Sequence, residues 1–448
     1  MRKFGMWMGL AAFGVQPAMA AVVHPEVAAI VQKVSPDTLR SDITTLVGFG
    51  TRHTLSDTTS PVRGIGAARG WVKSRFQAFA AACDNCLVVE TPEDTVSGDG
   101  LPQTALIQDV LAIQPGTSDP NRVIIISGHI DSRVTDLMNA TADAPGANDD
   151  GSGVAAVIEA ARLLSGRKFP ATIVYAVLSG EEQGLYGGQL LAKIAAQKGW
   201  QVEAVLNNDI IGNSHGLDGR VVDHEVRVFS EGTKDTETKA QATTRKYAGG
   251  ELDSPSRNLS RFIADVADAY VPDLHVRLIY RADRFGRGGD QLPMQEAGYP
   301  AVRVTEADEN YTRQHQDIRN EGGVAYGDVV AGIDFPYLAR VVRLNVASLA
   351  ALASAPPPPT QVRVAGAVTP DTTLSWKASP GAAGYEIHWR ETSAPAWQDS
   401  RDAGAGTTLT LKGVNIDDFT FGVSARSADG YDSPVEFPGF AGAFAVEK

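Results

Sequence analysis

The chain has 448 residues, enough for two or three domains of ordinary size. A hydrophobic content of 43% and a charged content of 21% are typical of a soluble globular protein. The 53 acidic residues outnumber the 40 basic ones, and the formal net charge is −13. This sign argues against a nucleic-acid or anionic-membrane partner, because phosphate binding needs an excess of Lys and Arg.

Residues 1–20 have the pattern of a signal peptide. Arg2 and Lys3 give a basic start, "FGMWMGLAAFGV" is a short apolar core, and "AMA" at 18–20 is a small-x-small cleavage signal. The apolar stretch is too short for a stable membrane anchor, although an uncleaved anchor is the alternative. We therefore expect export to the periplasm or the medium, a mature chain starting near Ala21, and no membrane insertion after cleavage.

The chain has two cysteines, Cys83 and Cys86, in the motif "CDNC". Two thiolates alone do not complete a cysteine-rich zinc site, and an oxidising compartment favours a small-loop disulfide. A free or redox-active pair is the alternative.

Strand-like and helix-like segments alternate through the first 350 residues. Apolar runs predict strands, and apolar residues at helical spacing predict helices. The strands are expected at 122–127, 172–178, 202–207, 276–280 and 301–305, and the helices at 153–164, 184–197 and 257–271. This alternation predicts an α/β domain with a mostly parallel mixed sheet and helices on both faces. Residues 214–256 are rich in Gly, Ser, Thr and charge, and we expect an insertion or long loop there.

A proline-rich segment, "SAPPPPT" at 354–360, separates this domain (21–353) from a different pattern. Residues 361–448 contain short runs of alternating apolar and polar residues, which predict a small C-terminal β-sandwich. The order of Trp376, Tyr385 and Tyr431 resembles that of a fibronectin type III domain. This domain is expected to contact a surface or another protein, or only to stabilise the larger domain.

Two adjacent carboxylates, Glu181 and Glu182, follow the buried strand at 172–178 in "LSGEEQG". Two ionised groups this close repel each other, and desolvating them is costly unless a cation compensates. A metal ion bound by one glutamate would leave the other free for proton transfer.

Other potential ligands follow the neighbouring strands. His129 and Asp131 come after the strand at 122–127, and Asp209 follows the one at 202–207. Asp149 and Asp150 precede the helix at 153, where Asp150 is expected to cap the helix. Parallel strands end at one edge of the sheet, so these side chains are expected to gather there.

The motifs "HxD", "GANDDGSG", "GEEQGLYG" and "ND", in this order, resemble the co-catalytic zinc exopeptidases typified by bacterial leucyl aminopeptidases and the glutamate carboxypeptidases. The resemblance covers roughly residues 40–350. It implies that His129 and Asp209 bind one Zn²⁺ ion, that Asp149 bridges two Zn²⁺ ions, and that Glu182 binds the second.

The resemblance also implies the catalytic roles. Glu181 is expected to be the general base that takes a proton from water, and Asp131 is expected to accept the second ring N–H of His129. His315 in "RQHQD" is the candidate histidine for the second ion. Arg287 is a candidate oxyanion donor.

The chain departs from the family pattern at three positions: Gly289 and Gln291 stand where the family has Ser and His, and His315 is followed by Gln rather than Thr. The expected activity is a zinc-dependent exopeptidase acting on peptides, with an aminopeptidase as the first hypothesis. A carboxypeptidase-type relative and a one-zinc glutaminyl cyclase are the alternatives.

Overall fold

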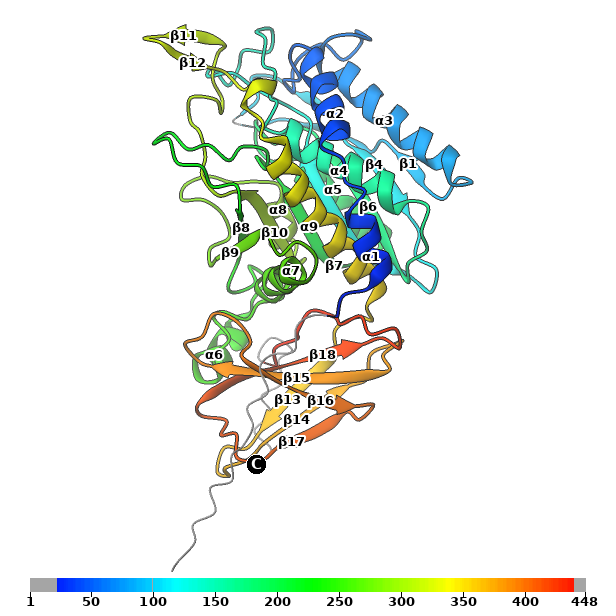
Figure 1. Cartoon of the computed structure of the whole chain (residues 1–448), viewed down its shortest axis with the longest axis vertical. Coiled ribbons are helices and arrows are strands. Elements are labelled where there is room, and N and C mark those ends of the chain that lie inside the picture. Colours follow the sequence, from blue (N-terminus) through cyan, green and yellow to red (C-terminus); the bar gives the residue numbers. More distant parts are fainter. Residues whose placement is uncertain (1–21, 99, 439–448) are drawn as a thin grey trace, which may run out of the picture.

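The computed structural model describes residues 22–98 and 100–438 and contains a large α/β domain followed by a smaller β domain (Figure 1). The predicted signal peptide at 1–20 lies outside the described residues.

One eight-stranded sheet organises the large domain. Its strands, in spatial order, are β1 (Val88–Glu90), β4 (Val110–Gln114), β6 (Ala171–Leu178), β5 (Asp119–His129), β7 (Gln201–Asn208), β10 (Ala301–Glu306), β8 (Glu225–Ser230) and β9 (His275–Ile279). The central strands β6, β5, β7 and β10 are parallel to one another. Antiparallel pairs join β1 to β4, β4 to β6 and β8 to β10.

Helices cover both faces of this sheet. One face packs against α3 (Gly64–Ala82), α4 (Gly151–Leu164), α7 (Pro255–Tyr270) and α9 (Phe335–Ser354). On this side α1 (Pro25–Val31) packs on α9, and α2 (Pro36–Gly48) packs on α4 and α9. The other face packs against α5 (Tyr186–Lys198) and α8 (Gln291–Glu296). By length and composition α9 could span a membrane, but 83% of its most apolar stretch is buried in the domain, as in a core helix.

The apolar run in β5 explains this two-sided burial. Ile124 and Ile126 point to the face covered by α4 and α9, whereas Val123 and Ile125 point to the face covered by α5 and α8. All four side chains are fully buried. A strand covered on both faces needs apolar residues at every position, which gives a continuous run. The predicted fold class is confirmed.

Residues 214–256 are more structured than a long loop. They supply β8, which inserts into the main sheet between β10 and β9, and the short helix α6 (Lys239–Ala248). Two small ribbons lie outside the sheet, formed by β2 (Glu93–Val96) with β3 (Ala105–Gln108) and by β11 (Arg319–Glu321) with β12 (Val324–Tyr326). A 3₁₀ turn, η1, spans Val330–Gly332.

The C-terminal domain consists of two three-stranded antiparallel sheets. One contains β13 (Thr360–Ala365), β14 (Thr372–Lys377) and β17 (Thr408–Leu411), and the other contains β16 (Asp399–Gly404), β15 (Gly384–Glu391) and β18 (Phe419–Arg426). Trp376 and Tyr385 lie in the shared core between the sheets. This is a small sandwich, and its assignment to the fibronectin type III class stays a prediction.

The two domains meet at the end of the main sheet where the central strand β5 begins. There the Arg122 guanidinium donates to the carbonyl oxygens of Leu352 (3.1 Å) and Ala355 (2.6 Å), at the end of α9. His129 stands at the other end of β5, about 23 Å away at the usual rise of ~3.3 Å per residue. The C-terminal domain therefore leaves the large domain on the side opposite to the predicted site.

Buried contacts fix the C-terminal domain in place. Arg390 pairs with Asp253 of the 214–256 segment at 2.7 Å, and both side chains are buried. The Tyr431 hydroxyl donates to Glu26 at 2.6 Å. In the large domain, Cys83 and Cys86 are joined by a disulfide.

Candidate metal centre

The side chains predicted to form the site come from the carboxyl ends of neighbouring parallel strands. His129 is the last residue of β5, Glu181 and Glu182 lie in the turn after β6, and Asp209 directly follows β7. Asp149 lies in the loop that leads into α4. The register of β5 with β6 and β7 places these strand ends side by side, as expected for an α/β site.

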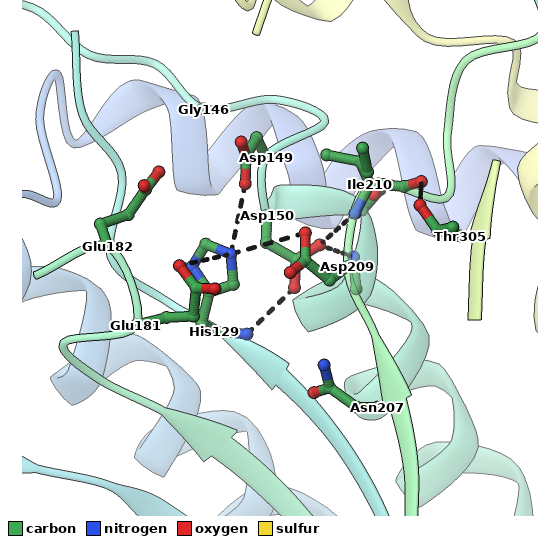
Figure 2. Close-up of polar contacts among 12 residues, drawn as sticks. His129, Gly146, Asp149, Asp150, Glu181, Glu182, Asn207, Asp209, Ile210 and Thr305 are labelled. Carbon is green, nitrogen blue, oxygen red and sulfur yellow. Dashed lines mark hydrogen bonds and ion pairs between the residues drawn. The ribbon is translucent and has the colours of Figure 1, made fainter. Parts of the chain in front are cut away.

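The first triad of possible ligands consists of His129, Glu181 and Asp209, and the Asp149 carboxylate also reaches it. The Nε2 atom of His129 lies 3.2 Å from Asp149 Oδ1, 3.8 Å from Asp209 Oδ1 and 4.0 Å from Glu181 Oε2. Figure 2 shows Asp149 and Asp209 reaching this ring from different loops, with Glu181 beside it. The His129, Glu181 and Asp209 atoms all lie within 4.8 Å of one another.

The second triad consists of His315, Asp149 and Glu182. His315 lies in the loop between β10 and β11. Its Nε2 lies 2.8 Å from Asp149 Oδ2 and 3.2 Å from Glu182 Oε1. The structure therefore brings together all five predicted ligands and Glu181. Asp149 belongs to both groups, because each of its oxygens faces a different histidine.

Two buried atoms in the centre have lone pairs that no hydrogen bond uses. His129 Nε2 and Glu182 Oε1 have no hydrogen-bond partner among the described residues. One such atom belongs to each triad, and buried polar atoms are seldom left unpaired. Nitrogen and carboxylate donors in this arrangement fit a divalent cation such as zinc.

Asp131 acts differently from the expectation. The His129 Nδ1–H donates to the backbone oxygen of Asp131 at 3.1 Å, whereas the carboxylate oxygen Oδ1 is 3.7 Å away. The carboxylate instead accepts the backbone N–H groups of Gly180 (2.8 Å), Glu181 (3.2 Å) and Glu182 (3.1 Å). Asp131 therefore orients His129 through its main chain and the two glutamates through its side chain.

Asp150 and Asp328 hold the loops that carry the ligands. Asp150 caps α4 by accepting from Gly153, as expected, and it also accepts the backbone N–H of His129 at 3.0 Å. Asp328 accepts the backbone N–H of Asp149 at 2.7 Å. The sequence analysis missed Asp328, which lies 179 residues from its partner.

The charges of the centre shift its pKa values strongly. Burial raises the pKa of Glu181, and the neighbouring Asp209 and Glu182 carboxylates raise it further, against the influence of His129. Burial also acts to raise the pKa of Asp209, but Arg303 and His129 outweigh it and hold this pKa at about 2. Of these two carboxylates, Glu181 is therefore the one that accepts a proton more readily.

The imidazole of His315 is also perturbed. Burial disfavours its charged form, but the Glu182 and Asp149 carboxylates outweigh burial and raise its pKa to about 10. The second triad therefore attracts positive charge, as a cation site should.

Two arginines that the sequence analysis missed contact the ligands. Arg303 is fully buried and places Nη1 2.6 Å from Asp209 Oδ2. Arg133 places Nε 2.9 Å from Glu182 Oε2. A charged residue inside the apolar strand "AVRVT" was the signal for Arg303, because a buried arginine needs a carboxylate partner.

A cleft of about 470 Å³ opens above the two triads. Its lining combines the acidic floor with a basic wall: Arg133, Asp149, Glu181, Glu182, Gln183, Gly184, Leu185, Asp209, Arg284, Arg287, Gly288, Gln314 and His315. Arg287, the candidate oxyanion donor, lines this cleft, but its Nη1 contacts Glu309 at 2.6 Å.

Known proteins share both sequence and fold with this chain. Residues 109–323 match peptidase family M28. A probable zinc metalloprotease from Pyricularia oryzae is 44% identical over 94% of this chain and 85% of its own length. Another from Leptosphaeria maculans is 42% identical over 92% of this chain and 96% of its own.

Solved structures share the fold at lower identity. The LapA aminopeptidase of Legionella pneumophila is similar with a TM-score of 0.54 and 22% identity, over 76% of this chain and 78% of that one. An aminopeptidase from Aneurinibacillus sp. strain AM-1 has a TM-score of 0.50 and 13% identity, over 73% of this chain and 96% of that one. On the strength of the sequence relatives, the chain belongs to peptidase family M28, and the prediction of a metallopeptidase is confirmed.

Proposed function

We propose that the protein is an exported exopeptidase that holds two Zn²⁺ ions and removes residues from the amino termini of peptides. The observation that carries this proposal is the position of Asp149. Its Oδ1 lies 3.2 Å from His129 Nε2, and its Oδ2 lies 2.8 Å from His315 Nε2. A carboxylate with one oxygen in each triad can be shared by two ions held a few ångströms apart.

The ligand assignment combines distances with the resemblance to the zinc exopeptidases. Glu181 lies about as far from His129 Nε2 (4.0 Å) as Asp209 does (3.8 Å), and the resemblance assigns Asp209 as the ligand and Glu181 as the proton acceptor. We therefore assign His129, Asp209 and Asp149 to one ion and His315, Glu182 and Asp149 to the other. Glu181 is left outside both sets, at the wall of the cleft.

Bound zinc supplies two effects at such a site, since it lowers the pKa of water toward ~7 and polarises a carbonyl. Glu181 accepts the proton of the attacking water and passes it to the leaving amine. Its raised pKa makes this side chain a better proton acceptor than an ordinary carboxylate. The Asp131 carboxylate holds the Glu181 backbone N–H and so fixes the direction of this side chain.

The charges around the cleft favour an aminopeptidase over a carboxypeptidase. A free substrate carboxylate would need an available arginine, and Arg284 and Arg287 do line the cleft. Both are already engaged, however, since Glu309 lies 3.3 Å from Arg284 and 2.6 Å from Arg287. The acidic floor instead suits the positive amino terminus of a peptide.

The glutaminyl cyclase alternative is less favoured. A one-zinc enzyme needs only the triad of Asp149, Glu182 and His315. The first triad, around His129 and Asp209, is also complete, which supports two ions and hydrolysis.

The proposal also covers the C-terminal domain and the predicted signal peptide. The C-terminal domain joins the large domain at the end of the sheet opposite to the cleft. This position supports contact with a surface or another protein rather than control of substrate entry. The 1–20 segment and the Cys83–Cys86 disulfide support export to an oxidising compartment. We further propose that the sandwich is of the fibronectin type III class.

The decisive experiment offers three substrate classes to the purified protein: amino-acid p-nitroanilides, their N-acetylated analogues, and peptides with a free carboxyl terminus but a blocked amino terminus. We expect release only from substrates with a free amino terminus. A chelator should abolish this release, and added Zn²⁺ should restore it. Cleavage of the N-blocked peptides from their carboxyl ends would instead establish the carboxypeptidase alternative.

A further inference from the structure

Gly289 and Gln291, two of the three departures from the family pattern, pack against a buried arginine. A Cβ atom on Gly289 would lie 2.5 Å from Arg303 Nη1 and 2.6 Å from Gln291 Oε1. Real Cβ atoms do not approach other atoms this closely, so a serine here would displace the guanidinium group. Gln291 is fully buried and donates to Asp283. The two departures therefore make room for Arg303 and its partners.

One carbonyl oxygen connects this buried arginine to the wall of the cleft. Arg303 Nη1 donates to the Gly288 carbonyl oxygen at 2.8 Å, and Arg284 Nη2 donates to the same oxygen at 3.1 Å. Arg303 also places Nη1 2.6 Å from Asp209 Oδ2. Arg284, Arg287 and Gly288 all line the cleft. The basic wall is therefore continuous with the first triad at the floor.

Arginines outnumber carboxylates in this wall. Glu309 is buried, and three guanidinium groups share it: Arg227 at 2.7 Å, Arg284 at 3.3 Å and Arg287 at 2.6 Å. Asp283 contacts Arg284 at 3.2 Å. Two carboxylates therefore face three arginines, which leaves one positive charge in surplus.

The pKa of Glu309 reflects this surplus. Burial acts to raise this pKa, but Arg284, Arg287 and Arg227 outweigh burial and hold it at about 2. Pairing with Glu309 holds the arginines in place without neutralising all of them. The side chain of Arg287 is 31% exposed, so surplus charge reaches the cleft. Among the described residues that line the cleft, Leu185 alone has an apolar side chain.

We propose that this wall favours substrates whose first residue, the one that is removed, carries the carboxylate side chain of aspartate or glutamate. In the proposed reaction the amino group and the carbonyl of that residue lie over the floor, so its side chain is the one nearest to the wall that begins at Asp209. The wall acts through its surplus charge rather than through a free guanidinium fork, and the amino terminus stays the group that the floor binds. The proposal deepens the proposed aminopeptidase function and rests on it.

The test compares two substrates of equal shape that differ by one charge, the α-p-nitroanilides of glutamate and glutamine, on the purified full chain with added Zn²⁺. For the wild-type protein at low salt, kcat/KM should be about tenfold higher for the glutamate substrate, the size of effect that nearby charges produce at a protein surface. This ratio should shrink as the ionic strength rises, because salt screens exposed charges. The lysine p-nitroanilide should be a poorer substrate than the glutamine one.

Variants of Arg287 assign the preference to the wall. Arg287→Gln should lower the glutamate-to-glutamine ratio by about threefold or more, because it removes one charge from the wall. Arg287→Lys keeps the charge and should keep most of the ratio. Arg401→Gln is the matched control, because Arg401 lies exposed on β16 of the C-terminal domain, and its ratio should equal that of the wild-type protein. Thermal unfolding measured in parallel checks that each variant is folded.

A second pair of substrates locates the charge relative to the cleaved bond. Ala-Glu-amide and Ala-Gln-amide differ in the residue after that bond and should be cleaved at equal rates. A preference for the acidic substrate in this pair alone would overturn the assignment to the first residue.

Three other results would also overturn the proposal: a wild-type ratio at or below one, an unchanged ratio in Arg287→Gln, or a ratio in Arg287→Lys as low as that in Arg287→Gln. Absence of release from every substrate with a free amino terminus would instead contradict the aminopeptidase function itself, so the two failures are distinguishable.

Discussion

Replacing Asp131 with Asn keeps the shape of the side chain but removes one of the two oxygens that accept the backbone N–H groups around Glu181 and Glu182. Oδ1 accepts the N–H groups of Gly180 and Glu181, and Oδ2 accepts the Glu182 N–H and the Thr54 hydroxyl. Asparagine has one carbonyl oxygen, so its amide N–H₂ must face one of these pairs. The Oδ2 side is the cheaper choice because the Thr54 hydroxyl can turn and accept. The Glu182 N–H would then face another donor at about the present 3.1 Å.

The expected cost is that of one hydrogen bond to a charged group, about 1.5–3 kcal/mol. If the misplaced glutamates lose this energy in the transition state, kcat/KM falls about 10- to 100-fold. The assay is steady-state hydrolysis of an amino-acid p-nitroanilide, with thermal unfolding measured in parallel to confirm a folded protein.

Asp109→Asn is the matched control. Asp109 is also fully buried near the end of β6, where Oδ1 accepts the Ser179 N–H at 2.9 Å. Its Oδ2 has no hydrogen-bond partner among the described residues, so an amide group there loses no bond. This variant should stay within about twofold of wild-type activity. An Asp131→Asn enzyme as active as Asp109→Asn would refute the assignment of Asp131 as the support of both glutamates.

Three further predictions concern the base, a buried acid and the domain contact. Glu181→Gln should lower kcat by about 10²- to 10⁴-fold while metal analysis still finds both ions, and substantial remaining turnover would contradict the assigned base. Burial raises the pKa of Asp42 from 3.8 to about 6, Arg75 offsetting part of the effect. The folded state thus keeps this proton while the unfolded chain loses it, so stability falls as pH rises from 3.8 to about 6. Asp42→Asn should accordingly raise the unfolding free energy by about 3 kcal/mol above pH ~6 and by little near pH ~4, and equal gains at both pH values would be inconsistent with that cause. Arg390→Met should lower Tm, because it breaks a buried pair with Asp253, yet leave kcat/KM unchanged; lost activity at wild-type Tm would argue that this domain acts on the site.

The sequence predicted the central fold because its strands are buried on both faces. Each of the runs at 122–127, 172–178, 202–207 and 301–305 lies inside an observed strand of the main sheet. The strand β8 was not predicted, since it lies within a polar segment and its alternate residues Glu225 and Arg227 are less buried. Positions on a partly exposed face need not be apolar, which leaves a weaker sequence signal.

The parts of the site also differ in how far the local sequence determines them. His129 and its partner, the Asp131 carbonyl, lie two residues apart, so one short motif encodes both the ligand and its tautomer. His315 depends on contacts between distant segments, since Arg133 is 182 positions away and the Thr135 hydroxyl that donates to its backbone oxygen is 180 away. Its φ of 56° is also unusual for a histidine and reflects tertiary contacts rather than local preference.

The two triads therefore differ in how they are built. His129 and Asp209 lie at or directly after the ends of parallel strands, and the main-chain acceptor of His129 is two residues away. The second triad takes His315 from the 307–318 loop, and Arg133 contacts both His315 and Glu182. Arg133 carries no ligand atom itself, so a ligand motif could not reveal it.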